Sequence, residues 1–326
     1  MKNWFKKENG SMTVYAVVTI FSFMIILTGV FLGASAVRKS QLKTIPKIKE
    51  AYGKDLDNIQ EIYDDREEQE EYIKNGLILH LDGINNTGNG HSNTTTTWKD
   101  LSGRGNDATL YNINNSATSG WQQDGLRLDG IDDYASLDPT KLTNLQQGTV
   151  IVDFELYDWN PNQQYDTIFF KGKESSWIYN HIQISENYYS ASDMNTTISN
   201  NVESTTSNLL IPVSLNTYKQ IALRWNGTQI SNFENGVLAK SITSSLYPAD
   251  DSTVCYLGRG YNENRFCNCK IKSLKIYNRA LTEAEIAHNY TIDKEKYNSV
   301  NETDYISQGL IAHYDVINNT GTGYNN

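Results

Sequence analysis

Cysteine is scarce in this sequence of 326 residues, which contains only Cys255, Cys267 and Cys269. Three is an odd number and too few for a disulfide-based scaffold. A C-x-C pair with one distant cysteine and no neighbouring histidine also offers too few ligands for zinc. The sequence therefore excludes both frameworks.

Basic residues are also few: 28 Lys and Arg stand against 38 Asp and Glu, which gives a net charge of −10. Nucleic-acid binding needs a clustered Lys/Arg surface, so nucleic acid is excluded as a partner. His80, His181 and His288 show no partner pattern for nucleophilic catalysis, and the sequence contains no G-x-S-x-G elbow.

One long uncharged and mostly apolar run covers residues 13–37. It is long enough to span a membrane as a helix, and residues 1–12 would form a cytoplasmic leader. A cleaved signal peptide is the alternative, because Ala34-Ser35-Ala36 offers a cleavage site. The run is longer than the apolar region of a signal peptide, however, and Arg38 follows the site directly. A permanent single-pass anchor is therefore favoured.

The residues before this run, Lys6-Lys7-Glu8-Asn9-Gly10 followed by Ser11, resemble the leader of pilin-like and Tad-type pilus-assembly proteins. The resemblance implies cleavage between Gly10 and Ser11. Tyr15 stands where such pilins often carry a glutamate. Gly29 and Gly33 form a G-x-x-x-G pattern, which permits helix-mediated self-association.

Residues 38–74 predict a helical stalk or linker, whose acidic end at 64–71 is typical of a solvated spacer. Lysines and arginines lie on both sides of the apolar run. Long C-terminal domains cross the membrane largely regardless of charge, so we expect the C-terminal domain outside the cell.

Strand patterns dominate after residue 74. Residues 149–156 alternate, with four apolar side chains on one face and Asp153 and Glu155 on the other. Residues 219–241 predict a meander with Asn-Gly turns at 226–227 and 235–236. A capping box at 282–285 predicts a short helix to about residue 290. This pattern predicts two packed antiparallel sheets in a jelly-roll sandwich.

Five segments occur in an order and spacing that resemble a LamG-like, concanavalin A-like jelly roll over residues 75–295. They are residues 76–82, 98–112, 125–137, 222–234 and 271–286. The resemblance implies an all-β fold and a role in binding a carbohydrate or a surface protein, as in adhesion. Residues 76–88 recur as 309–321, so we expect residues 296–326 to hold a linker and the truncated start of a second such domain.

Oxygen-rich loops suggest calcium as a cofactor, because this cation takes six to eight oxygen ligands. The predicted ligands are Asp129, Asp132, Asp133 and Asp82, with Asp100 and Asp107 as further contributors. LamG-like domains often hold calcium, which favours the hypothesis. Asx turns that cap the loop backbones are the alternative.

A sugar site needs aromatic platforms and amide side chains in loops. The predicted ligand-binding residues are Trp159, Tyr165, Trp177, Tyr188, Tyr261 and Asn264, with Tyr189 beside them. Trp98, Trp121 and Trp225 are expected in the core. If residues 254–259 and 266–277 formed a hairpin, Cys255 would lie opposite Cys269, and these two could form a disulfide; three buried thiols are the alternative.

The jelly-roll resemblance also includes glycosidases, whose acids lie along one strand as E-x-D-x-E. Here Asp153 and Glu155 lack the third acid, because Ile151 occupies its position. We therefore expect a membrane-anchored binding protein that is not an enzyme. A pilin-like subunit with a LamG-like head and a glycan-active hydrolase are the alternatives.

Overall fold

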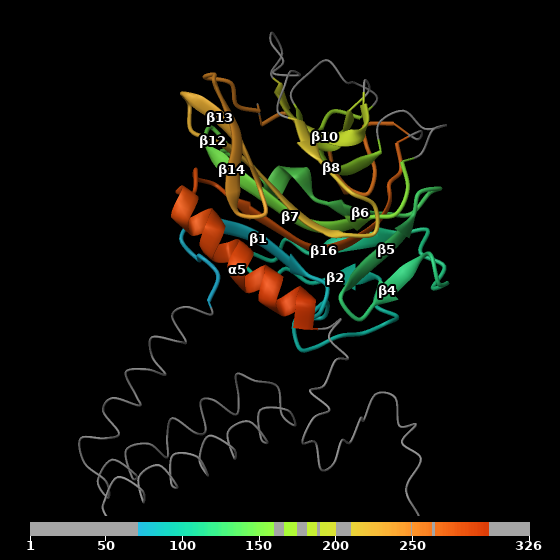
Figure 1. Cartoon of the computed structure of the whole chain (residues 1–326). Coiled ribbons are helices and arrows are strands. Elements are labelled where there is room, and N and C mark those ends of the chain that lie inside the picture. The colour runs from blue at the N-terminus through green and yellow to red at the C-terminus, as the bar shows by residue number, and fades with distance from the viewer. Residues whose placement is uncertain are drawn as a thin grey trace, which may run out of the picture. The chain divides into compact units, whose positions relative to one another are not determined.

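The computed structural model describes residues 71–159, 166–174, 181–187, 190–199, 210–248, 250–262 and 265–299. In these residues the chain forms two eight-stranded antiparallel sheets with one helix, α5, along the outer side of the first sheet (Figure 1). The predicted all-β sandwich is confirmed at this level. The segments predicted as leader, membrane helix and stalk, together with Gly10 and Ser11, lie outside the described residues. Within the described residues, no helix is long and apolar enough to cross a membrane.

Sheet A has the strand order β14-β13-β12-β7-β16-β5-β4, and β1 pairs with the second half of β16. Its strands are β1 (Leu77–Asp82), β4 (Gly120–Gln122), β5 (Gly125–Asp129), β7 (Gly148–Leu156), β12 (Tyr218–Trp225), β13 (Gln229–Glu234), β14 (Val237–Thr243) and β16 (Asn268–Tyr277).

Sheet B has the order β11-β10-β9-β8-β15-β6-β3-β2. Its strands are β2 (Thr97–Trp98), β3 (Ala108–Tyr111), β6 (Tyr134–Leu137), β8 (Thr167–Gly172), β9 (His181–Asn187), β10 (Ser190–Ser199), β11 (Leu210–Pro212) and β15 (Val254–Leu257). A short 3-10 helix, η1 (Pro139–Lys141), follows β6.

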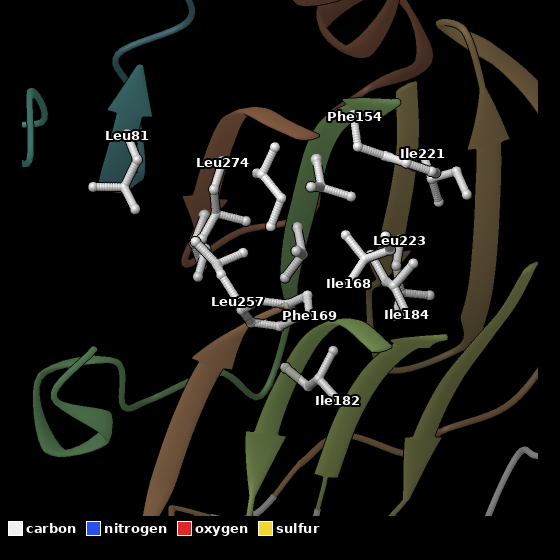
Figure 2. Close-up of a cluster of buried hydrophobic side chains, with 14 of the residues drawn as sticks. Leu81, Phe154, Ile168, Phe169, Ile182, Ile184, Ile221, Leu223, Leu257 and Leu274 are labelled. Carbon is white, nitrogen blue, oxygen red and sulfur yellow. The ribbon is translucent and has the colours of Figure 1, made fainter. Parts of the chain in front are cut away.

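The main core lies between the two sheets. On β7 the alternation places Val150, Val152, Phe154 and Leu156 in this core, as predicted. Figure 2 shows Phe154, Ile221 and Leu274 of sheet A facing Phe169, Ile184 and Leu257 of sheet B. The three tryptophans expected in the core are also buried, and each indole N–H donates to a backbone carbonyl: Trp98 to Asp82, Trp121 to Thr95 and Trp225 to Leu145.

The predicted meander β12-β13-β14 is confirmed, but its two turns differ. Asn235 and Gly236 both have positive φ, as an Asn-Gly hairpin turn requires. In the other turn only Gly227 has positive φ, and the Asn226 side chain instead accepts the backbone N–H groups of Thr228 and Gln229. The turn between β12 and β13 is therefore a three-residue loop held by an Asx-type cap.

The C-terminal helix α5 (Glu283–Ser299) begins with the predicted capping box. The Thr282 hydroxyl accepts the N–H of Glu285 at 3.2 Å, and the Thr282 N–H donates to the Glu285 carboxylate at 2.8 Å. The helix continues nine residues beyond the predicted end at Tyr290. The added turns are held by Asp293 and Tyr297, which are buried against sheet A.

The prediction of a hairpin that would place Cys255 opposite Cys269 is wrong, because the two strands pair only at the tip of the loop between them. Arg259 and Phe266 form an isolated bridge, but the two arms then separate into different sheets. Cys255 lies on β15 beside β6 and β8, whereas Cys269 lies on β16 beside β5 and β7. All three cysteines are buried free thiols. Burial raises the pKa of Cys255 to about 12, which makes its thiol unreactive at neutral pH.

Candidate functional site

The outer side of sheet B is open to solvent over β2, β3 and β6. Thr97, Thr109 and Ser136 form a row of cross-strand neighbours across these strands. Beside this row Tyr111 of β3 lies directly opposite Tyr134 of β6. Their rings stack with centroids 4.8 Å apart at 7°, and Tyr111 is 43% exposed. An accessible aromatic surface next to hydroxyl groups is suited to the apolar face and the hydroxyls of a sugar ring.

Toward the middle of sheet B, further aromatic side chains adjoin this pair, and these are buried. Tyr134 makes an edge contact of 5.3 Å with Tyr256, which lies directly opposite Phe170 on the neighbouring strand. Phe170, Tyr256 and Tyr261 form a buried cluster separate from the main core. We call Tyr111, Tyr134, Tyr256, Phe170 and Tyr261 the aromatic face.

Two guanidinium groups lie against the aromatic face, Arg265 at Tyr261 and Arg259 at Tyr134 and Tyr256. The Arg259 guanidinium carbon is 5.0 Å from the centroid of the Tyr134 ring and 4.7 Å from that of Tyr256. Its Nη2 lies 3.4 Å from a carboxylate oxygen of Glu174. Its Nε is buried and has no hydrogen-bond partner in the described part of the chain.

The loop that crosses from sheet A to sheet B carries three carboxylates next to the aromatic face. Asp129 ends β5 and Asp133 directly precedes Tyr134 of β6. One oxygen from each of Asp129, Asp132 and Asp133 lies within 4.8 Å of the other two. Asn112, next to Tyr111, donates its side-chain N–H to the carbonyl of Asp132 at 2.9 Å and so connects this acidic loop to β3.

The acidic loop fits a hard cation. Asp133 is fully buried, and no group in the described segments forms a hydrogen bond with its Oδ1. Burial raises the pKa of Asp133 to about 6, and the charges of Asp129 and Asp132 contribute to this rise. Calcium prefers clustered carboxylate oxygens of this kind, and its charge would offset the repulsion among them.

Only part of the predicted metal set comes together in the structure. Asp129, Asp132 and Asp133 are grouped, but Asp82 is wrong as their fourth ligand. Asp82 lies on β1 beside α5, where it pairs with Lys296 and accepts the Tyr297 hydroxyl. Asp100, which follows β2, accepts the backbone N–H groups of His80, Ser102 and Asn106. Asp107 pairs with Lys99.

A pocket of about 210 Å³ adjoins the open part of sheet B. It is lined by Thr94, Thr95, Thr96, Leu110, Asn112, Ile113 and Asn115. Hydroxyl and amide groups around two apolar side chains can receive a small polar ligand or one sugar unit.

The predicted sugar-binding residues are only partly described. Tyr261 is buried in the aromatic face, where the Arg265 guanidinium lies 4.1 Å from the centroid of its ring. Trp159 is half-buried against the main core. Tyr165, Trp177, Tyr188, Tyr189 and Asn264 lie outside the described residues. The prediction missed Tyr111, Tyr134 and Arg259. For Tyr111 the available signal was the strand-like alternation ATLY of β3, which places Tyr111 on the same face as Thr109.

The acid pair considered from the sequence, Asp153 and Glu155, shares the outer face of sheet A as expected. Neither side chain faces solvent, because α5 and the segment around Tyr72 cover this part of the sheet. Asp153 is fully buried and accepts hydrogen bonds from Tyr218, Gln220 and Ser273 at 2.6, 2.9 and 2.5 Å. Glu155 forms ion pairs with Lys270 and Lys272, which also pair with Asp124.

With this geometry in place, residues 129–287 match the family described as the concanavalin A-like lectin/glucanases superfamily. This match supports a concanavalin A-like lectin/glucanase domain over residues 129–287. The match begins at Asp129 of the acidic loop and ends within α5. No curated protein matches the sequence.

Solved structures share the fold of this concanavalin A-like domain at low sequence identity. A Trypanosoma rangeli sialidase is 14% identical with a TM-score of 0.51, over 76% of this chain and 40% of that one. The same sialidase in complex with a difluorinated KDN is 16% identical with a TM-score of 0.50, over 68% and 33%. Domain 4 of AbnA, an extracellular GH43 arabinanase from Geobacillus stearothermophilus in complex with arabinotriose, is 16% identical with a TM-score of 0.49, over 66% and 98%.

This chain therefore spans about a third of the length of the sialidase chains that it resembles. At such identities the similarity concerns the fold. Because glycoside hydrolases carry this fold, the comparison contradicts the expectation that the protein is not an enzyme.

Proposed function

We propose that this concanavalin A-like domain binds carbohydrate on the outer side of sheet B, as the ligand-binding part of a cell-surface protein. The observation that supports this proposal most directly is the exposed Tyr111, which stacks on the partly buried Tyr134 beside a row of hydroxyl side chains. A sugar ring laid on this pair would stack on aromatic surface while its hydroxyls bond to Thr109 and Ser136.

Calcium is part of the proposal. Asp129, Asp132 and Asp133 would hold the ion, which would supply positive charge beside the aromatic face. The chain's own residues would then orient the sugar through the tyrosine pair and through Asn112, which fixes the acidic loop to β3.

The test is a glycan array probed with the whole chain, solubilised in detergent, with calcium and again with chelator. Reproducible binding that is lost on chelation supports a calcium-dependent carbohydrate-binding domain. Binding that persists in chelator supports the tyrosine platform alone. Absence of binding in both conditions contradicts the proposed function.

A single substitution localises the site. Tyr111→Ala is expected to weaken binding of an array-positive saccharide by about two- to tenfold, because one stacked aromatic contact is lost. Isothermal titration calorimetry measures the change. Tyr247→Ala is the matched control, since Tyr247 is also 43% exposed and lies outside the aromatic face. Equal losses in both variants would contradict the assigned position.

We further propose that residues 13–37 anchor the chain in a cell membrane, with the domain outside, where it would contact a polysaccharide or a surface protein in adhesion. The uncharged apolar run supports an anchor, and the Lys6 to Ser11 segment supports a pilin-like form of it. N-terminal sequencing of the mature protein separates the two. A chain that begins at Ser11 favours a pilin-like subunit, and an intact N-terminus favours a plain anchor.

A further inference from the structure

The aromatic face contains a cation whose hydrogen-bonding capacity is largely unused. A guanidinium carries five N–H donors in a planar fork. Arg259 directs Nη2 at Glu174 over 3.4 Å, while its buried Nε has no acceptor among the residues that the structure describes. Charge-assisted hydrogen bonds between a guanidinium and a carboxylate normally measure about 2.7–2.9 Å. The contact with Glu174 is therefore too long to satisfy this cation.

The surroundings of Arg259 strengthen its attraction for an anion. Three aromatic rings lie within 6 Å of its guanidinium carbon, at 5.0 Å for Tyr134, 4.7 Å for Tyr256 and 5.8 Å for Phe266. Arg259 itself is buried, at 8% exposure. In such surroundings an ion pair is much stronger than the same pair in water.

Glu174 occupies the place of an anionic ligand without being tightly bound there. Its side chain is 50% exposed, and one oxygen lies 3.4 Å from both Arg259 Nη2 and the Tyr256 hydroxyl. A half-exposed side chain with two long contacts can turn out into solvent at little cost. A carboxylate from outside could then accept from Nε and Nη2 together and from the Tyr256 hydroxyl.

We propose that the aromatic face selects saccharides that carry a carboxylate, such as uronic or sialic acids, and that Arg259 binds this carboxylate in the place that Glu174 takes in this structure. This inference rests on the carbohydrate-binding function proposed above. The tyrosine pair provides the platform for the sugar ring, and Arg259 selects sugars that carry a negative charge.

The experiment is an array that prints each acidic saccharide beside its methyl ester, which keeps the ring and removes the charge. The whole chain in detergent is expected to bind the acids at least about tenfold more strongly than their esters. Equal binding to acids and esters would overturn the anionic selectivity and leave the carbohydrate-binding function standing. Absence of binding to either would overturn both.

Two variants assign the selectivity to this pair of side chains. Glu174→Ala is expected to strengthen binding of the acids about threefold or more and to leave binding of the esters unchanged, because a competing internal carboxylate is removed. Asp251→Ala is the matched control: this exposed carboxylate pairs with Lys173 at 2.6 Å. Arg259→Lys is expected to lower the preference for acids over esters, since an ammonium cannot form the bidentate pair. If Glu174→Ala weakened binding of the acids, Arg259 would not hold the ligand as proposed.

Discussion

Replacing Lys275 by methionine is expected to lower the free energy of unfolding by about 3–5 kcal/mol, the usual cost of removing one partner from a buried ion pair. Lys275 on β16 is fully buried. Its Nζ lies 2.7 and 2.8 Å from the two carboxylate oxygens of Asp293 on α5, and 3.7 Å from Asp153 on β7. Methionine would leave both carboxylates buried without a cation, and urea denaturation measures the loss.

A matched control and a rescue make this result specific. Lys240→Met on the exposed strand β14 is expected to change stability by less than about 0.5 kcal/mol. Adding Asp293→Asn to Lys275→Met is expected to recover part of the loss, because it removes one of the uncompensated charges. A loss below about 1 kcal/mol for Lys275→Met would mean that water reaches this cluster and that α5 does not seal it.

The same cluster predicts a pH dependence of stability. Burial raises the pKa of Asp293 above its usual value of 3.8, and the neighbouring charge of Asp153 adds to the rise, while Lys275 and the Tyr72 hydroxyl oppose it. Because the folded pKa lies above the unfolded one, the folded chain keeps a proton that the unfolded chain has released, in a pH window that begins at about pH 4. Stability should therefore fall as pH rises through this window.

Asp293→Asn tests that dependence, since it removes the titrating group and should flatten this part of the stability curve. Denaturation midpoints at half-unit pH steps measure it. Glu285→Gln is a useful comparison, because the pKa of Glu285 is lowered to about 2 by Arg279 and its contribution is constant above about pH 5. An unchanged slope in Asp293→Asn would show that another group titrates.

Local patterns predicted the parts of the fold that depend on neighbouring residues. The alternation of Val150 to Leu156 identified a strand and its core face, and Thr282 with Glu285 located the start of α5. These features are encoded within a few residues, where strand and helix periods leave a clear signal.

Contacts between distant residues could not be predicted in this way. Asp153 has the pattern of a solvent-facing acid, but α5 carries Asp293 over it from 140 positions further along the chain. The sequence on the two sides of the Arg259–Phe266 bridge predicts one hairpin. In the structure, β15 and β16 belong to different sheets. The Glu174 and Arg259 pair likewise joins residues 85 positions apart, which no local pattern marks.

Calcium at a concentration of about 100 times its dissociation constant is expected to stabilise the protein by about 2.7 kcal/mol, and Asp133→Asn is expected to abolish this effect. Asp133 contributes a buried oxygen, Oδ1, that has no hydrogen-bond partner among the described residues. In chelator, Asp133→Asn is instead expected to stabilise the protein. Because burial raises the pKa of Asp133 to about 6, its charge opposes folding at pH 7, and asparagine removes that charge.

Thermal unfolding at pH 7 would therefore find the wild type more stable than Asp133→Asn in calcium and less stable than Asp133→Asn in chelator. Asp158→Asn, an exposed acid outside the acidic loop, should behave as wild type in both conditions. Lowering the pH to 5 should weaken calcium binding to the wild type, since the ion must then displace a proton from Asp133. Equal stabilisation of the wild type and Asp133→Asn by calcium would mean that the ion binds elsewhere, and the tyrosine pair would have to bind sugars without it.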